Sequence, residues 1–131
     1  MSLYAPLAIA AGAALGAWLR WGLGLWLNPL WTALPLGTLA ANLGGGYLMG
    51  LVMAWLGQGA ALAPELRLGL TVGFLGGLTT FSTFAGESVT LLGRGDYLGA
   101  LLHAGAHLFG SLLMVALGMA SFSLLAAGLR A

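Results

Sequence analysis

Four long apolar runs constrain what this chain of 131 residues can fold into. They span approximately residues 3–27, 35–56, 67–92 and 97–129, separated by short breaks rich in proline, glycine or charge. Each run supplies the roughly 20 residues that a helix needs to cross a hydrocarbon core of about 30 Å. Charged residues make up 5% of the chain, against about a quarter in a soluble domain. The sequence therefore predicts an all-α integral membrane protein, with residues 1–131 forming a single domain of four transmembrane helices.

Composition also excludes several classes of function. A net charge of +1 without any lysine offers no basic face for a nucleic acid, so no nucleic-acid partner is expected. The absence of cysteine excludes disulfides and cysteine-based metal sites. The chain shows no phosphate-binding loop and no Ser–His–acid set, and we expect no enzymatic activity. The first apolar run lacks a basic leader and continues to Leu19, which indicates a retained span and not a cleaved signal peptide.

The arginines are balanced between the two sides of the membrane. Four spans place Arg67 and Arg130 on one side, and Arg20 and Arg94 on the other. Because the Lys/Arg imbalance sets orientation, this chain carries no strong instruction about which way to insert. Two readings remain: neighbouring proteins or lipids decide, or the chain inserts both ways and assembles as an antiparallel homodimer. The close balance favours the second reading.

Glycine pairs indicate close contacts between helices. Gly12 and Gly16 form a GxxxG pair, as do Gly46 and Gly50. Small residues at this spacing let helix backbones approach each other. Because a four-helix bundle fills its own interior with side chains, a conducting path is expected between subunits.

Polar residues recur on single helix faces inside the apolar runs. At i, i+4 spacing the second run carries Thr38, Asn42 and Gly46. The fourth run carries His103, His107 and Ser111 at the same spacing. A polar group facing lipid would be unsatisfied, so these faces must meet protein or water. Intramembrane polar residues indicate function by default, although hydrogen bonds between helices, worth about 0.6 kcal/mol each, are an alternative. Either role is open for Thr38, whereas Asn42 together with two histidines favours an ion or substrate pathway.

The third run contains a segment that is poor material for a continuous helix. From Gly73 to Phe84 it has three glycines and then four hydroxyl residues interleaved with two phenylalanines. Glycine and threonine both disfavour a helix interior, so we expect a break in mid-membrane. Unwound carbonyls can coordinate a cation, while half-helix N-termini favour anions. The positive ring edges of Phe81 and Phe84, together with amide and hydroxyl donors, suit a small anion.

These motifs resemble those of the Fluc (CrcB) family of fluoride channels. The segment from Gly73 to Phe84 is similar to the family's GGxTTFSTF motif without a gap. The first run resembles the family's signature in Gly12, Gly16 and Arg20. The second run resembles it in Gly37, Thr38, Asn42 and Gly46. The resemblance covers essentially the whole chain.

The resemblance implies a dual-topology antiparallel homodimer in the cell inner (plasma) membrane, in contact with membrane lipid. It would conduct fluoride ions passively out of the cell along two pathways. The pathway residues it implies are Asn42, Phe81, Phe84, Thr38, Ser82 and Thr83. Backbone carbonyls of Gly76 and Thr79 would hold a structural sodium ion at the dimer centre. Arg20 and Glu87 would have vestibule or structural roles.

The fourth run departs from the family's pattern. Where the family usually has Asn or Tyr followed by Ser, this chain has His103 and His107, with Ser111 continuing the row. We include all three in the expected pathway. A protonated histidine would attract an anion, which suggests the hypothesis that fluoride flux depends on pH. Flux through His103→Ala and His107→Ala over the range in which histidine titrates tests it, and a flat wild-type profile would remove the idea.

Two other classes compete with a channel. A small proton-coupled exporter would need a membrane-embedded acid; the first run has none, and Glu87 lies near the end of the third. A membrane scaffold would not need amides and hydroxyls along helix faces. Liposome flux separates the three: passive fluoride release indicates a channel, dependence on a proton gradient an exporter, and no flux a scaffold.

Overall fold

The computed structural model describes residues 3–31 and 34–129, and every regular element in these ranges is a helix. In chain order they are α1 (Tyr4–Leu27), η1 (Asn28–Leu30), α2 (Leu36–Gly57), α3 (Pro64–Leu68), η2 (Gly69–Leu75), α4 (Gly76–Leu78), α5 (Phe81–Gly93) and α6 (Tyr97–Gly128). Four stretches are long and apolar enough to cross a membrane: Tyr4–Leu30, Leu36–Gly57, Pro64–Gly93 and Tyr97–Gly128. The prediction of an all-helical protein with four membrane-spanning helices is confirmed.

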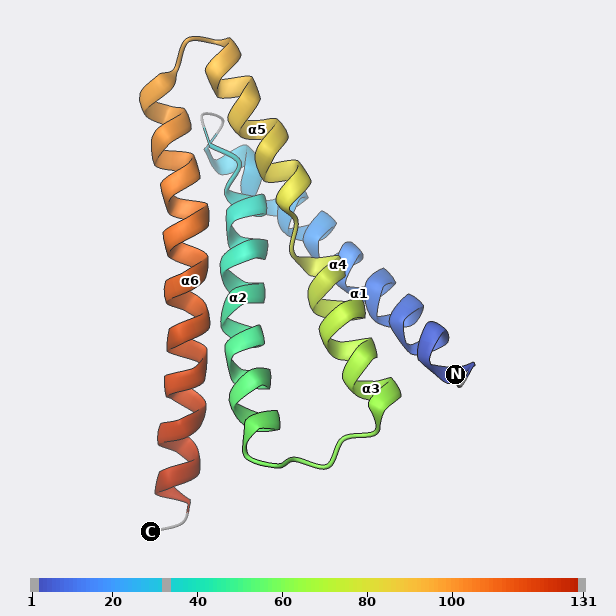
Figure 1. Cartoon of the computed structure of the whole chain (residues 1–131). Coiled ribbons are helices and arrows are strands. Elements are labelled where there is room, and N and C mark those ends of the chain that lie inside the picture. Colours follow the sequence, from blue (N-terminus) through green and yellow to red (C-terminus); the bar gives the residue numbers. More distant parts are fainter. Residues whose placement is uncertain (1–2, 32–33, 130–131) are drawn as a thin grey trace.

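The helices associate in two close pairs. In Figure 1, α2 lies along α6, and α1 crosses the third span beside η2 and α4. A tight turn joins α5 to α6: Gly95 has a φ of 75°, and the Asp96 carboxylate accepts a hydrogen bond of 2.9 Å from the Gly99 N–H. Glycine tolerates this left-handed conformation without strain, and the aspartate caps the N-terminus of α6.

Glycines lie where the paired backbones meet. A Cβ atom at Gly16 would be 2.7 Å from the backbone nitrogen of Leu78, and one at Gly12 would be 2.8 Å from that of Phe74. A Cβ at Gly50 would likewise be 2.9 Å from the backbone nitrogen of Met119 on α6. No side chain fits at such separations. The expected close packing at the glycine pairs of the first and second spans is confirmed.

The third span is not one continuous helix. Its middle part, η2, is wound as a π-helix, a form found often at functional sites. Thr79 (φ −83°, ψ 155°) and Thr80 (φ −152°, ψ 121°) are extended and separate α4 from α5. The last amide of α4, Thr79 N–H, donates to the Leu75 carbonyl at 3.0 Å. The Thr80 hydroxyl then accepts from Thr83 N–H at 3.2 Å and caps α5.

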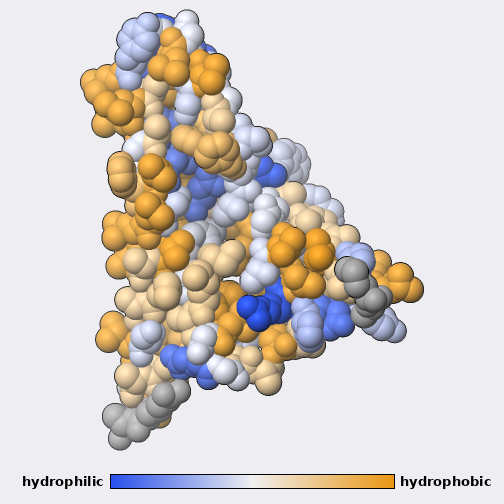
Figure 2. All heavy atoms as spheres, in the orientation of Figure 1, coloured by the Kyte–Doolittle hydropathy of each residue, from blue (hydrophilic) through white to orange (hydrophobic). Residues whose placement is uncertain are grey.

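The exterior is apolar, as lipid contact requires. Figure 2 shows hydrophobic residues along the visible length of α6 and hydrophilic residues in the recess between α6 and α5. Four exposed tryptophans lie in the second half of α1 and just beyond it: Trp18, Trp21, Trp26 and Trp31. Tryptophan favours the membrane–water interface, which suits the end of a span. Of the four arginines weighed above, Arg130 lies outside the described residues.

Candidate functional site

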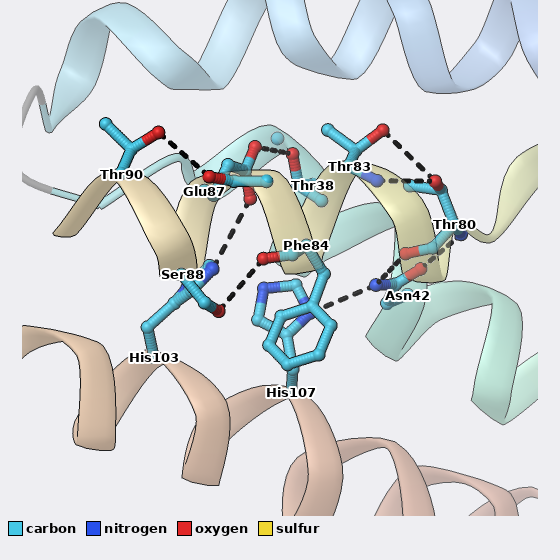
Figure 3. A network of polar contacts seen from close by, with 12 residues as sticks. Thr38, Asn42, Thr80, Thr83, Phe84, Glu87, Ser88, Thr90, His103 and His107 are labelled. Carbon is cyan, nitrogen blue, oxygen red and sulfur yellow. Dashed lines mark hydrogen bonds and ion pairs between the residues drawn. The ribbon is translucent and has the colours of Figure 1, made fainter. Parts of the chain in front are cut away.

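Asn42 on α2 is bonded to the backbone at the break in the third span. Its Oδ1 accepts from Thr80 N–H at 2.7 Å, and its Nδ2 donates to the Thr80 carbonyl at 3.0 Å (Figure 3). One amide side chain thus satisfies the Thr80 N–H, which has lost its helical acceptor, and adds a donor to the Thr80 carbonyl at the start of α5. Because the Thr80 N–H can only donate, this pair also fixes which end of the Asn42 amide is oxygen.

That orientation determines the hydrogen position on His107. The Nδ2 atom of Asn42 lies 3.0 Å from Nδ1 of His107. Since Nδ2 can only donate, Nδ1 must accept, and the ring hydrogen of His107 is on Nε2. The ring stacks on Phe84 with centroids 4.7 Å apart and meets the ring of His103 edge-on at 4.4 Å.

Glu87 on α5 joins the second histidine to α2. The Thr38 hydroxyl donates to Oε1 of Glu87 at 2.5 Å, and Oε2 of Glu87 lies 3.4 Å from Nε2 of His103. We call the connected side chains the polar line, made of Asn42, His107, His103, Glu87 and Thr38. In Figure 3 they project from α2, α5 and α6 toward one another.

Three atoms of the polar line are buried without a hydrogen-bond partner: Glu87 Oε2, His103 Nε2 and His107 Nε2. The two histidines are 3% and 5% exposed, so water from outside does not satisfy them. Leaving a buried polar atom unpaired costs about 1–3 kcal/mol. Glu87 Oε2 and His103 Nε2 face each other at 3.4 Å and His107 Nε2 has no partner, so this group of atoms has capacity left for a small polar guest.

The polar line connects two pockets. The first, of about 460 Å³, is lined among others by Asn42, Phe84 and His107. The second, of about 470 Å³, is lined among others by Arg20, Thr38 and Glu87. His103 contacts the side chains of both His107 and Glu87. The buried, unpaired atoms thus lie between one pocket and the other.

The remaining expected site residues lie around this line. The ring of Phe81 is 79% exposed and meets that of Phe84 edge-on at 5.4 Å, so the two rings do share a face. Ser82 and Thr83 are exposed, and both hydroxyls lie within 3.3 Å of the Thr80 hydroxyl. Ser111 lies in the lining of the first pocket.

Sequence reasoning missed the role of Thr80. It belongs to the hydroxyl-rich segment but was not among the expected site residues, although it is the partner of Asn42. The available signal was a threonine directly before the point where the helical pattern resumes, a residue type favoured at a helix N-cap.

The break also frees backbone carbonyls, among them those of Gly76 and Thr79. In a continuous helix, Gly76 O and Thr79 O would accept from the amides of Thr80 and Thr83. Those amides donate instead to Asn42 Oδ1 and Thr80 Oγ1. Gly76 is exposed and Thr79 half-buried, and both line the first pocket. Such carbonyls are suitable oxygen ligands for a hard cation.

The fold and the site define a multi-pass membrane protein with a polar line through its interior. Residues 7–119 match the model of the family described as "CrcB-like protein, Camphor Resistance (CrcB)", and the chain belongs to this family. The resemblance found in the sequence motifs is therefore confirmed.

Several relatives carry the name "Fluoride-specific ion channel FluC". The protein of Aromatoleum aromaticum is 57% identical over 122 residues, covering 93% of both chains. That of Thiobacillus denitrificans is 58% identical over 119 residues, covering 91% of this chain and 96% of the relative. That of Nitrosospira multiformis is 57% identical over 126 residues, covering 96% and 98%. The similarity thus extends over nearly the full length of each.

Proposed function

We propose that this protein is a fluoride-selective passive ion channel of the cell inner membrane, and not an enzyme. The relatives named as fluoride channels support the class of activity. The observation that carries the proposal is the polar line, because its buried, unpaired atoms lie between two pockets. Its physiological effect is the release of accumulated cytosolic fluoride down the ion's gradient.

Fluoride is small and strongly hydrated, so the path must replace its water with donors at close range. His107 Nε2–H is a buried donor with no partner, and the ring edges of Phe81 and Phe84 and the hydroxyls of Ser82, Thr83 and Ser111 add weaker ones. None carries a fixed full charge that would trap the ion. Binding must be strong enough to admit the ion and weak enough to release it.

Asn42 has no spare donor in the single chain. One amide hydrogen is directed to the Thr80 carbonyl and the other to His107. Asn42 therefore donates to a passing ion by exchanging its bond to His107 for one to fluoride. The bond to fluoride is charge-assisted and must offset the loss of the bond to His107, whose Nδ1 is left without a donor.

The functional unit is an antiparallel, dual-topology homodimer with two pathways. A single chain leaves Phe81 largely exposed, and the first pocket opens on the surface beside Gly76 and Thr79. A second copy against this face would enclose both. Opposite orientations agree with the balanced arginines of the sequence.

Sodium at the centre of this dimer fits the donors present. The carbonyls of Gly76 and Thr79 have lost their helical amides to Asn42 and Thr80. One copy supplies these oxygens and the second copy supplies the same set, which suits a hard monovalent cation. When bound, the ion supplies a positive charge that offsets the repulsion between anions in the two pathways.

The second pocket serves as a vestibule. Arg20 and Glu87 both line it, and among the described residues the one ion-pair contact of Glu87 is with His103. Arg20 therefore attracts fluoride to the entrance, while Thr38 holds the Glu87 carboxyl in place.

Fluoride efflux from liposomes tests the function. Purified protein is reconstituted with internal potassium fluoride, a potassium ionophore carries the counter-ion, and an electrode follows release. We expect rapid release of fluoride and retention of chloride. Flux that requires a proton gradient would indicate an exporter instead, and no flux would indicate a scaffold.

Two substitutions test the residue roles. Asn42→Asp should abolish flux because it replaces the amide donor by a carboxylate that can only accept, while Gln58→Glu adds the same charge at an exposed turn and should conduct. Phe81→Ile should reduce flux, while Phe109→Ile removes another largely exposed ring, on α6, and should not. Normal conduction by Asn42→Asp would show that the pathway assignment is wrong.

A further inference from the structure

The three unpaired atoms of the polar line have the chemistry of metal ligands. Glu87, His103 and His107 each offer one ligand atom, and these atoms all lie within 4.8 Å of one another. The side chains come from α5 and from adjacent turns of α6, so two packed helices hold them. We propose that Glu87, His103 and His107 form a binding site for a divalent transition-metal ion of the zinc class.

The spacing of the first two ligands already suits such an ion. Zinc binds histidine nitrogen and carboxylate oxygen at about 2.0–2.2 Å, so neighbouring ligands of a tetrahedral site are about 3.3–3.6 Å apart. Glu87 Oε2 and His103 Nε2 are 3.4 Å apart. Two histidines and one carboxylate, with a fourth position left for water or an anion, is an established zinc-ligand set.

Among residues 3–31 and 34–129 this is the one cluster of such ligands. The chain has two histidines and no cysteine, and both histidines belong to this cluster. Magnesium and calcium prefer sets made of oxygen atoms alone, so two imidazoles select a softer ion. Tag-free protein that binds zinc tightly must therefore use these residues.

The neighbouring side chains favour metal binding at Glu87 and disfavour it at His107. Thr38 donates to Oε1 of Glu87 and leaves Oε2 free, the outer-shell arrangement that orients a ligating carboxylate. A metal on Nε2 of His107 would move that ring's hydrogen to Nδ1, which faces the Nδ2 donor of Asn42. Metal binding therefore breaks the bond between Asn42 and His107 and leaves two donors facing each other. The site therefore binds zinc more weakly than a site in which a carboxylate stood in place of Asn42 and accepted the hydrogen of His107 Nδ1.

A metal here has a consequence for transport, and this part rests on the proposed function. The cluster lies between the two pockets, so an ion held by three side chains blocks the route between them. It also breaks the Asn42 contact and occupies the His107 donor. Zinc should therefore inhibit fluoride flux reversibly, with a chelator restoring it.

Calorimetric titration of zinc chloride into tag-free protein tests the site. We expect one zinc per chain in the wild type and at least tenfold weaker binding in His103→Ala, His107→Ala and Glu87→Gln. Glu65→Gln removes an acid near the start of α3, outside the cluster, and should bind as the wild type does. No binding by the wild type, or equal affinity in the histidine variants, would overturn the proposal.

Cobalt provides a check that does not depend on variants folding. Co²⁺ bound to wild-type protein should show the intense visible absorption of a tetrahedral site, and zinc should displace it. Weak absorption typical of six-coordinate cobalt would contradict the three-ligand geometry.

Fluoride flux measured in the presence of zinc distinguishes failure of the blocking role from failure of the proposed function. Wild-type flux should fall at least tenfold at saturating zinc and return with chelator. Zinc binding without inhibition would overturn the blocking role. A protein that binds zinc but never conducts fluoride would refute the proposed function and leave the metal site standing.

Discussion

Replacing Asn42 by alanine should destabilise the fold more than the loss of a typical intramembrane hydrogen bond. The substitution removes both bonds to Thr80, of 2.7 Å and 3.0 Å, and the contact with His107. Thr80 is 8% exposed, so neither its N–H nor its carbonyl gains water in exchange. At about 1–3 kcal/mol for each of the two buried groups left without a partner, Thr80 N–H and His107 Nδ1, the expected loss is about 2–6 kcal/mol.

Asn28→Ala is the matched control for this prediction. Asn28 makes a single side-chain bond, accepting from Gly37 N–H at 2.8 Å near the end of a span, where its own side chain is exposed. Its loss should cost only about 1 kcal/mol. The free energy of unfolding of both variants can be measured by titrating mixed micelles with a denaturing detergent. Equal losses for Asn42→Ala and Asn28→Ala would refute the argument that the amide supports the break.

Three further substitutions or measurements follow from the geometry. Gly16→Ala should destabilise the fold by several kcal/mol, because its Cβ would meet backbone atoms. Gly22→Ala is the control: its Cβ would have nothing within 4 Å, so stability should be unchanged or rise by up to about 1 kcal/mol. Similar effects of both substitutions on detergent unfolding would contradict the close packing at Gly16. Thr38→Val keeps the side-chain shape but removes the donor to Glu87, and should cost about 1 kcal/mol or more in the same assay. Nitrogen NMR of His107 should show the hydrogen on Nε2, and a proton on Nδ1 would contradict the assigned contact.

The sequence predicted the architecture because apolar length is a local property. Four runs of sufficient length can be read without knowledge of the partners they pack against, and glycine spacing likewise identified the packing faces of the first two spans. The i, i+4 spacing also indicated which polar side chains lie together, since Asn42 contacts His107 and His107 contacts His103.

The contacts between residues of different helices could not be predicted from spacing within one segment. That Asn42 reaches the backbone of Thr80, and Glu87 both Thr38 and His103, depends on the rotation and depth of each helix against its neighbours. No periodicity within one segment encodes these quantities. The metal-ligand cluster was missed for the same reason, because its carboxylate and its imidazoles are on different helices.

Glycines hold α1 against the first part of the third span and α2 against α6, and Gly37 sets α2 against the backbone of α1 as well. The two bonds between Asn42 and Thr80 add a connection between α2 and the point where the third span is interrupted. A shift of α2 along the third span would therefore have to break both bonds at once. The depth of Asn42 in the membrane is in this way tied to the position of the interruption.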